Sequence, residues 1–124
     1  MPLNIVAADD DARMREFYRD VLQHLGYGVV GVAADGRSLV EMCLRAEDSV
    51  DLVVTDIRMP NMSGVHAACI VAERRASPFL FVSAFQDDLL SQATNLPFDY
   101  SYLIKPVSLL DLAAAIPRAA RGKR

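Results

Sequence analysis

Polar side chains follow four apolar runs of this sequence, one set at the end of each run. Asp56 closes the run DLVVT, Ser83 follows FLFV, and Lys105 follows YLI. Asp9 and Asp10 come directly after LNIVAA. Open α/β sheets place their ligands at the carboxyl ends of the strands, where residues far apart in the chain meet. The pattern therefore predicts one site that contains all of these side chains.

The residue types in this set suit the transfer of a phosphoryl group. A carboxylate such as Asp56 can act as a nucleophile and form an aspartyl phosphate, and the transfer mainly needs alignment and neutralisation of the moving oxygens. Asp9 and Asp10 beside Asp56 would repel one another unless a divalent cation lay between them. Mg²⁺ suits that place because it binds few carboxylates and keeps positions for water and phosphoryl oxygens. Lys105 would supply a fixed positive charge, and the Ser83 hydroxyl could donate a hydrogen bond to a phosphoryl oxygen.

Alternating strands and helices must position these residues. Apolar and β-branched runs predict strands at 3–8, 27–34, 51–56, 79–84 and 102–105. Apolar residues at helical spacing predict helices at 14–25, 39–46, 65–72 and from 108 onward, with a short fourth helix at 86–94. Such an alternation with short connections favours parallel strands joined by right-handed crossovers.

Local signals mark the ends of two of these helices. Asp11 is expected to cap the first helix. Ser108, with Asp111 three residues later, has the pattern of a capping box at the start of the last helix. Pro117 should kink or end that last helix near Ile116, because proline cannot donate the backbone hydrogen bond.

Length and composition restrict the class of protein. The 124 residues predict one domain over 1–124, with a core at about 3–120 and a basic tail at 118–124. A net charge of −3 argues against a nucleic-acid-binding module. The sequence shows no secretion-signal pattern and no apolar run long enough for a bilayer, which favours a soluble, cytoplasmic protein without membrane contact. Cys43 and Cys69 lie in apolar helical patterns and are expected to be buried, reduced thiols.

These motifs together resemble the receiver domain of response regulators in two-component signalling, in particular a single-domain, chemotaxis-regulator-like receiver. The resemblance covers about residues 3–120. Each motif alone is weak, but all four occur in order and each lies at a predicted strand end. The motifs are the pair Asp9 and Asp10, the DIRMP segment with Pro60 and Gly64, FVSA with Ser83, and YLIKP with Tyr102, Lys105 and Pro106.

The resemblance implies a flavodoxin-like, doubly wound α/β fold. In that fold a five-stranded parallel sheet in the order 2-1-3-4-5 is flanked by five helices. It also implies a function: the domain takes a phosphoryl group from a histidine kinase or phosphotransfer protein and changes the surface of its fourth and fifth strands and helices. That surface would signal to a downstream protein or to an output domain outside this chain. The domain would acquire and lose its own phosphoryl group rather than act as an enzyme on other substrates.

The same resemblance implies roles for the acidic residues and for one backbone carbonyl. Asp56 would be the phosphoacceptor. Mg²⁺ would be the cofactor, held by Asp10, Asp56 and the backbone carbonyl of Arg58. Asp9 would act on the metal through water.

The remaining site residues are implied to neutralise charge and to switch the surface. Lys105 would pair with the phosphoryl group or with Asp56, and the Lys105–Pro106 peptide bond is expected to be cis. Ser83 and Tyr102 would form the switch: the hydroxyl moves to the phosphoryl group and the ring turns inward.

Other interpretations stay open on the sequence alone. One alternative is an interaction module that does not depend on phosphorylation. It would have the same fold and a vestigial site, and would bind its partners through its surface alone. A phosphatase or phosphotransferase with an aspartate nucleophile would usually need a second acid two residues past Asp56, where Arg58 stands. Arg15 and Tyr18 on the first helix are possible contacts for a histidine kinase. Phe98 either packs over the core or stands exposed as an anchor for a partner.

Overall fold

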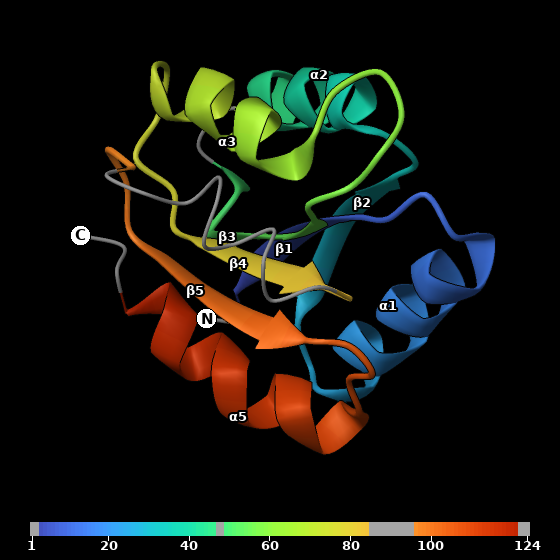
Figure 1. Cartoon of the computed structure of the whole chain (residues 1–124). Coiled ribbons are helices and arrows are strands. Elements are labelled where there is room, and N and C mark those ends of the chain that lie inside the picture. The colour runs from blue at the N-terminus through green and yellow to red at the C-terminus, as the bar shows by residue number, and fades with distance from the viewer. Residues whose placement is uncertain (1–2, 47–48, 85–95, 122–124) are drawn as a thin grey trace.

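Five parallel strands run through the middle of the molecule in the order β2-β1-β3-β4-β5 (Figure 1). The computed structural model describes residues 3–46, 49–84 and 96–121. The strands are β1 (Asn4–Ala8), β2 (Gly28–Ala33), β3 (Leu52–Asp56), β4 (Phe79–Ser83) and β5 (Tyr100–Ile104). The described helices are α1 (Ala12–His24), α2 (Gly36–Ala46), α3 (Gly64–Ala72) and α5 (Leu109–Ala120). None of these four helices has the length and apolar character needed to cross a membrane.

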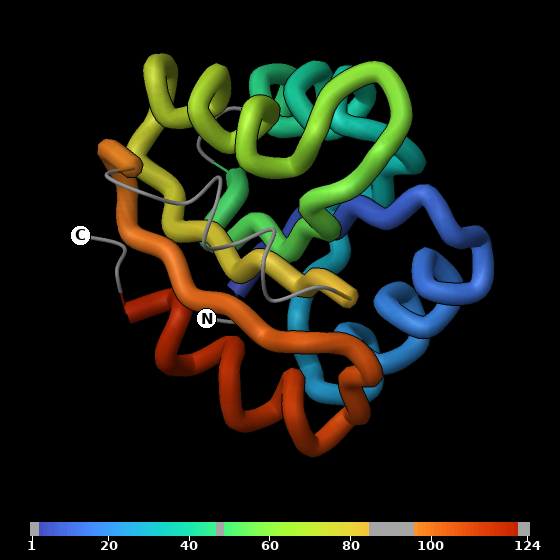
Figure 2. Tube along the Cα trace, viewed as in Figure 1, coloured from blue at the N-terminus to red at the C-terminus, as the bar shows by residue number. Residues whose placement is uncertain are grey.

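Helices cover both faces of the sheet: α1 and α5 lie on one face, and α2 and α3 lie on the other (Figure 2). Each face has its own apolar core, with Leu22 and Ile116 among the buried residues on the first face and Leu39 on the second. Every residue of β3 and β4 is buried. A strand covered on both faces must be apolar along its length, which explains the continuous runs in the sequence.

The predicted number, direction and order of the strands are confirmed. β5 begins at Tyr100 rather than at residue 102, because Tyr100 already pairs with Phe79 of β4. The helix predicted at 86–94 lies outside the described residues, so four of the five expected helices are seen. Both cysteines of the chain are free thiols, as expected, but only Cys43 is fully buried and Cys69 is partly exposed.

The two helix caps predicted from the sequence are confirmed, but the last helix extends further than predicted. Asp11 caps α1 by accepting a hydrogen bond from the backbone N–H of Arg13, and Ser108 and Asp111 form the predicted capping box of α5. Pro117 was expected to kink or end α5 near Ile116; the helix does not end there but continues through Pro117 to Ala120. Proline removes a single backbone hydrogen bond near the helix end, while Ile116 and Ala119 remain buried against the sheet and hold the last turn in place.

Phe98 packs over the core rather than standing free on the surface. It is partly buried, and its ring centroid lies 4.7 Å from that of Phe79 and 6.3 Å from that of Phe81. Of the two positions left open by the sequence, the structure shows the packed one. A tilted aromatic cluster of this kind contributes both apolar burial and favourable ring contacts.

Replacing Phe98→Ala should therefore lower the free energy of unfolding by about 2 kcal/mol. This is less than the roughly 3–5 kcal/mol typical of a fully buried phenylalanine, because Phe98 is only partly buried. Denaturant unfolding followed by circular dichroism measures the loss. Leu110→Ala is the matched control, since Leu110 is 75% exposed and its removal should change stability by less than about 0.5 kcal/mol. Equal effects of the two changes would show that Phe98 does not support the core.

Candidate functional site

The carboxyl ends of four neighbouring strands bring the predicted site residues together. Lys105 follows β5, and its Nζ donates hydrogen bonds to Asp9 Oδ2 at 2.8 Å and to Asp56 Oδ2 at 3.1 Å. The strand register allows this contact, because Ser83 at the end of β4 pairs with Ile104 and its carbonyl accepts the backbone N–H of Lys105 at 2.8 Å. The Lys105–Pro106 peptide bond is cis, as the resemblance implies. One lysine thus bridges the ends of β1 and β3.

Three carboxylates form one cluster at this edge. Asp9, Asp10 and Asp56 each offer an oxygen, and these oxygens all lie within 4.8 Å of one another. Asp9 is fully buried, Asp56 is 7% exposed and Asp10 is exposed. The cluster therefore has two carboxylates held inside the protein and a third that faces solvent.

The backbone after β1 is held in place by several hydrogen bonds to Asp9. The Asp9 N–H donates to the carbonyl of Ala33 at 3.1 Å, and Asp9 Oδ1 accepts the N–H of Asp11 at 2.9 Å. Arg15 of α1 donates from its guanidinium to the Asp9 carbonyl at 2.9 Å. Sequence reasoning considered Arg15 only as a possible kinase contact and missed this bond. The sequence feature that could have indicated this bond is the position of Arg15 near the start of α1, which begins directly after the acidic residues.

Asp56 is fixed by its neighbours in the chain and by a glycine. Its Oδ1 accepts the N–H of Ile57 at 2.7 Å, and its carbonyl accepts the Thr55 hydroxyl at 2.9 Å. Gly64, the first residue of α3, lies so close to the Asp56 carbonyl that a Cβ atom would overlap it. The glycine at this position is thus required for close approach of the helix to the strand end.

The electrostatics of the pair Asp56 and Lys105 follow from burial and mutual contact. Burial raises the pKa of Asp56 above its ordinary value; Lys105 opposes this rise, and the neighbouring Asp9 carboxylate adds to it. Burial by itself would lower the pKa of Lys105, but its hydrogen bonds to Asp9 and Asp56 and their charges outweigh burial, so this pKa is raised. Lys105 therefore stays protonated while it is shared by two buried carboxylates.

The donor atoms of the cluster fit a hard divalent cation. All three side chains offer carboxylate oxygens, which Mg²⁺ prefers over nitrogen or sulfur ligands. Arg58 lies in the loop between β3 and α3, two residues past Asp56, so a backbone carbonyl is available close to the cluster in sequence. The exposure of Asp10 leaves one side of the cluster open to solvent, which suits an ion that retains bound water.

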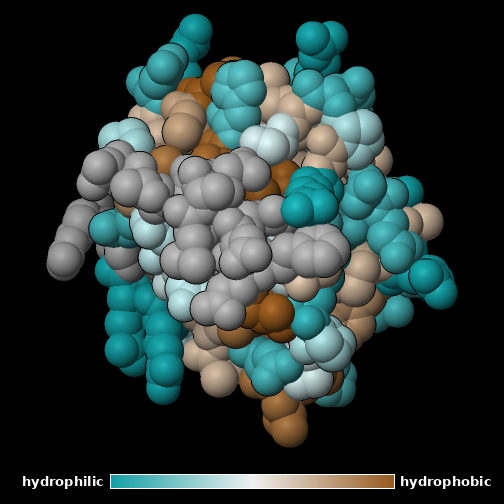
Figure 3. Space-filling model, in the orientation of Figure 1, coloured by the Kyte–Doolittle hydropathy of each residue, from teal (hydrophilic) through white to brown (hydrophobic). Residues whose placement is uncertain are grey.

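The two residues of the predicted switch lie at different depths. Ser83 is 1% exposed, next to Lys105 in the sheet, whereas the side chain of Tyr102 points outward and is 51% exposed. In the view of Figure 3, hydrophobic residues of the described part are visible toward the top and toward the bottom of the molecule, among hydrophilic ones. The structure therefore places Ser83 beside Lys105 at the carboxyl end of the sheet, whereas the Tyr102 ring is exposed. The large apolar side chains exposed in the described part are Val30, Tyr100, Tyr102, Ile104 and Leu110.

Tyr18 is not a surface residue, so its interpretation as a kinase contact is wrong. The side chain is fully buried in the core under α1, and burial raises the pKa of its hydroxyl, with the charges of Asp9 and Asp56 adding to the effect. The helical spacing of its neighbours places it on the inner face of α1.

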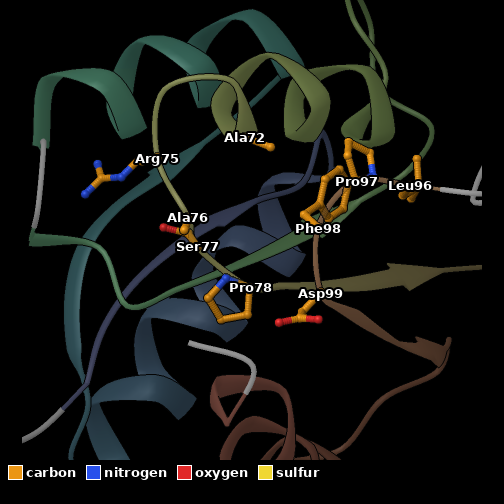
Figure 4. A pocket seen from close by; sticks show the side chains of 9 residues that line it. All are labelled: Ala72, Arg75, Ala76, Ser77, Pro78, Leu96, Pro97, Phe98 and Asp99. Atoms are coloured by element: carbon orange, nitrogen blue, oxygen red, sulfur yellow. The ribbon is translucent and has the colours of Figure 1, made fainter. Parts of the chain in front are cut away.

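A separate hollow of about 440 Å³ lies at the opposite edge of the sheet, where β4 and β5 begin (Figure 4). Pro78, Phe98 and Asp99 are among its lining residues. In Figure 4 the Arg75 guanidinium extends away from Phe98, and it donates a hydrogen bond to the carbonyl of Cys43 at 2.6 Å. The Arg75 guanidinium thus joins α2 to the segment after α3, and the hollow contains none of the clustered carboxylates.

Comparison with known sequences identifies a family over most of the chain. The family described as "Response regulator receiver domain" matches residues 5–117. The transcriptional regulatory protein PdtaR of Mycobacterium tuberculosis is 37% identical over 120 residues, and the positive alginate biosynthesis regulatory protein of Pseudomonas aeruginosa is 33% identical over 125 residues. These matches cover 96% and 98% of this chain, but the chain spans only 57% and 49% of the length of these relatives.

Solved structures show the same fold at lower sequence identity. A chain in the CheX–CheY–BeF3–Mg complex from Borrelia burgdorferi has a TM-score of 0.86 and 20% identity, over 95% of this chain and 89% of that one. The receiver domain of a sensor histidine kinase from Pseudomonas aeruginosa, with a magnesium ion coordinated in its active site cleft, has a TM-score of 0.84 and 22% identity, over 98% of this chain and 99% of that one. At these identities the likeness concerns the fold.

Replacing Asp56→Asn should raise the stability of the protein in the absence of divalent cations. The change removes one of two buried carboxylates that share Lys105, while the pair Lys105 and Asp9 remains. Relief of the like-charge contact should contribute about 1 kcal/mol, or roughly 3–5 °C in Tm for a domain of this size. Calorimetry at neutral pH with a chelator measures the shift. Asp10→Asn is the control, because its carboxylate is exposed and already solvated, and it should have a smaller effect. A lower Tm for the Asp56 variant would contradict this account of the cluster.

Proposed function

The chain belongs to the response regulator receiver family of two-component signalling, and we propose that it stores a signal as a phosphoryl group on Asp56. The observation that carries the proposal is the position of Asp56. Its carboxylate lies at the end of a buried strand, hydrogen-bonded to Lys105 at 3.1 Å and clustered with Asp9 and Asp10. A nucleophile, a fixed cation and an acidic cluster for a metal are thus adjacent, as phosphoryl transfer to a carboxylate requires.

In the proposed reaction a carboxylate oxygen of Asp56 attacks the phosphorus atom of a phosphohistidine. A new O–P bond forms and the N–P bond of the donor breaks. The electron pair of that bond returns to the imidazole nitrogen, which takes a proton from water. Attack of water on the phosphorus atom of the aspartyl phosphate then breaks the O–P bond, releases inorganic phosphate and returns Asp56 to its carboxylate form. The domain therefore changes its own covalent state and acts on no separate substrate.

Lys105 and the acidic cluster neutralise charge in this reaction. Lys105 bridges Asp9 and Asp56 in the described structure and would exchange part of this contact for an oxygen of the phosphoryl group. We assign Mg²⁺ to Asp10, Asp56 and the carbonyl of Arg58, with Asp9 acting through water. When bound, the ion would offset the negative charge of the transferring oxygens. Asp9 is fully buried whereas the adjacent Asp10 is exposed, which supports Asp10 rather than Asp9 as the direct ligand of this pair.

Ser83 and Tyr102 are proposed to report phosphorylation to the surface. The Ser83 hydroxyl would donate to a phosphoryl oxygen, and the Tyr102 ring would turn from its exposed position toward the space this movement opens. Ser83 is buried and Tyr102 is 51% exposed. This difference supports a movement that begins at Ser83 inside the protein and is passed to Tyr102 at the surface. The switch would change the surface of β5 and α5.

The proposed partners are a histidine kinase or phosphotransfer protein as donor and a protein that binds the changed surface. A solved structure of the same fold is described as a complex of CheX, CheY, BeF3 and magnesium, which supports a protein as the recipient of the signal. Because the chain spans about half the length of the curated relatives it matches, an output domain is a second possible recipient of the signal. The alternative is a phosphorylation-independent module with a vestigial site, and the following experiment separates the two.

Incubation with acetyl phosphate and Mg²⁺ should add one phosphoryl group to the protein, detected by intact mass. Hydroxylamine should remove it, since an acyl phosphate reacts with strong nucleophiles. Asp56→Asn should abolish the addition, because an amide is not a nucleophile for this reaction. Ser83→Ala is the control, as it leaves the acceptor in place and should still be labelled. Labelling that survives the Asp56 change would refute the assignment, and no labelling of the wild type would favour the vestigial module.

Mg²⁺ affinity should fall further for Asp10→Ala than for Asp9→Ala. The first change removes an exposed carboxylate assigned as a direct ligand, and the second removes a buried carboxylate assigned to water-mediated contact. Titration calorimetry measures both dissociation constants, with a loss of about tenfold or more expected for Asp10. Thermal unfolding of each variant serves as the control for folding. Equal losses, or a greater loss for Asp9, would place the metal differently.

A further inference from the structure

A hydrogen bond joins the loop of the proposed metal site to the neighbouring turn before α2. Asn61, in the loop between β3 and α3, donates from Nδ2 to Oδ2 of Asp35 at 3.0 Å. Asp35 directly precedes α2 and lies 26 residues away from Asn61 in the chain. The contact therefore connects two loops that enter different helices on the same face of the sheet.

Asp35 is oriented for this contact by its role at the start of α2. Its Oδ1 accepts the backbone N–H of Ser38 at 2.8 Å, and the carbonyl of Asp35 accepts the N–H of Leu39 at 3.0 Å. With one oxygen used by the helix, the other oxygen is available to Asn61. The hydrogen bond from the Ser38 backbone lowers the pKa of Asp35, and the bond from Asn61 acts in the same direction, so the acceptor is ionised at neutral pH.

The backbone conformation of the loop also favours its contact with the turn before α2. Asn61 has a φ of +70°, a left-handed conformation that asparagine adopts more readily than most residues. Next to it, the Met62 carbonyl lies so close to Gly36 that a Cβ atom on the glycine would overlap it. Two independent contacts, one between side chains and one at the backbone, thus hold the same two segments together.

This loop contains the carbonyl that we assign to the metal. The N–H of Gly64 donates to the carbonyl of Ile57 at 2.8 Å and closes the loop around Arg58. On the strand side the loop is fixed by the hydrogen bond from the Ile57 N–H to Asp56 Oδ1. On the far side, the side-chain hydrogen bond from Asn61 to Asp35 joins the loop to the turn before α2.

We propose that Asp35 and Asn61 are positioning residues for the divalent cation, because their hydrogen bond orders the loop that presents the Arg58 carbonyl. This inference rests on the proposed function, since it concerns the same metal site. Without the hydrogen bond, cation binding would have to order the loop, and part of the binding free energy would be lost to that ordering. Asp35 and Asn61 do not contact the cation; they act through the loop.

A double-mutant cycle on the full chain tests the proposal by titration calorimetry with Mg²⁺. Asn61→Gly removes the donor, keeps the positive φ and leaves the net charge unchanged. Asp35→Ser removes the acceptor for Asn61 but retains a good helix cap. Each single change should weaken Mg²⁺ binding by about three- to tenfold, the range expected for loss of one ordinary, solvent-exposed hydrogen bond. The double variant should bind within about twofold of the single variants, because both changes remove the same contact.

Two further measurements separate positioning from a general loss of structure or of charge. Asp11→Ser is the matched control: it removes an exposed helix-capping aspartate beside the same site, and it should change Mg²⁺ affinity by less than about twofold. Phosphorylation of Asn61→Gly by acetyl phosphate should be slow at low Mg²⁺ and return to the wild-type rate at saturating Mg²⁺, which a damaged acceptor site would not do.

Unchanged Mg²⁺ affinity in Asn61→Gly would overturn the proposal while leaving the proposed function intact. Losses that multiply in the double variant would also overturn it, since they would show that the two residues act separately. If the wild type itself did not bind Mg²⁺, both this proposal and the assigned metal role would fail. Weakened binding in both single variants, with no further loss in the double variant, supports the contact as the cause.

Discussion

The contact of Lys105 with Asp9 and Asp56 is the interaction on which the site depends. Two carboxylates inside a protein are unfavourable unless a cation compensates them, and Lys105 does so from the end of a third strand. This is possible because β1, β3, β4 and β5 are consecutive in the sheet and parallel, so that their carboxyl ends meet. The strand order is therefore a chemical requirement of the site as well as a feature of the fold.

Much of the fold and of the site could be predicted from the sequence, because buried parallel strands are apolar along their length and polar residues at their ends are conspicuous. Asp56, Asp9 and Lys105 were found in this way, and the structure brings them into contact. The burial of each side chain could not be predicted from the sequence in the same way. Tyr18 was expected at the surface but is buried, and Asp10 is exposed although the adjacent Asp9 is buried. Both results depend on the direction of the side chain, which tertiary packing decides. Pro117 is a similar case, since burial of the last turn outweighs a local stop signal.

A second set of contacts surrounds the clustered carboxylates and acts on the backbone. Arg15 binds the carbonyl of Asp9, Gly64 packs against the carbonyl of Asp56, and Asn61 ties the following loop to Asp35. None of these residues was among the predicted site residues, because each acts on main-chain atoms or on a neighbouring loop. The site is thus held by α1, α2 and α3 as much as by the sheet, and a description limited to the charged residues would miss how their geometry is kept.

The two glycine contacts have an evolutionary consequence. Gly64 is pressed against the Asp56 carbonyl at the start of the loop, and Gly36 is pressed against Met62 near its end, so both limits of the loop are set by backbone packing. An insertion or deletion between them would displace one of these contacts, whereas a substitution of an exposed side chain between them would not. The side chains that surround the acceptor can therefore change during evolution while the loop keeps one length. Related sequences should differ in this loop by substitutions rather than by insertions or deletions.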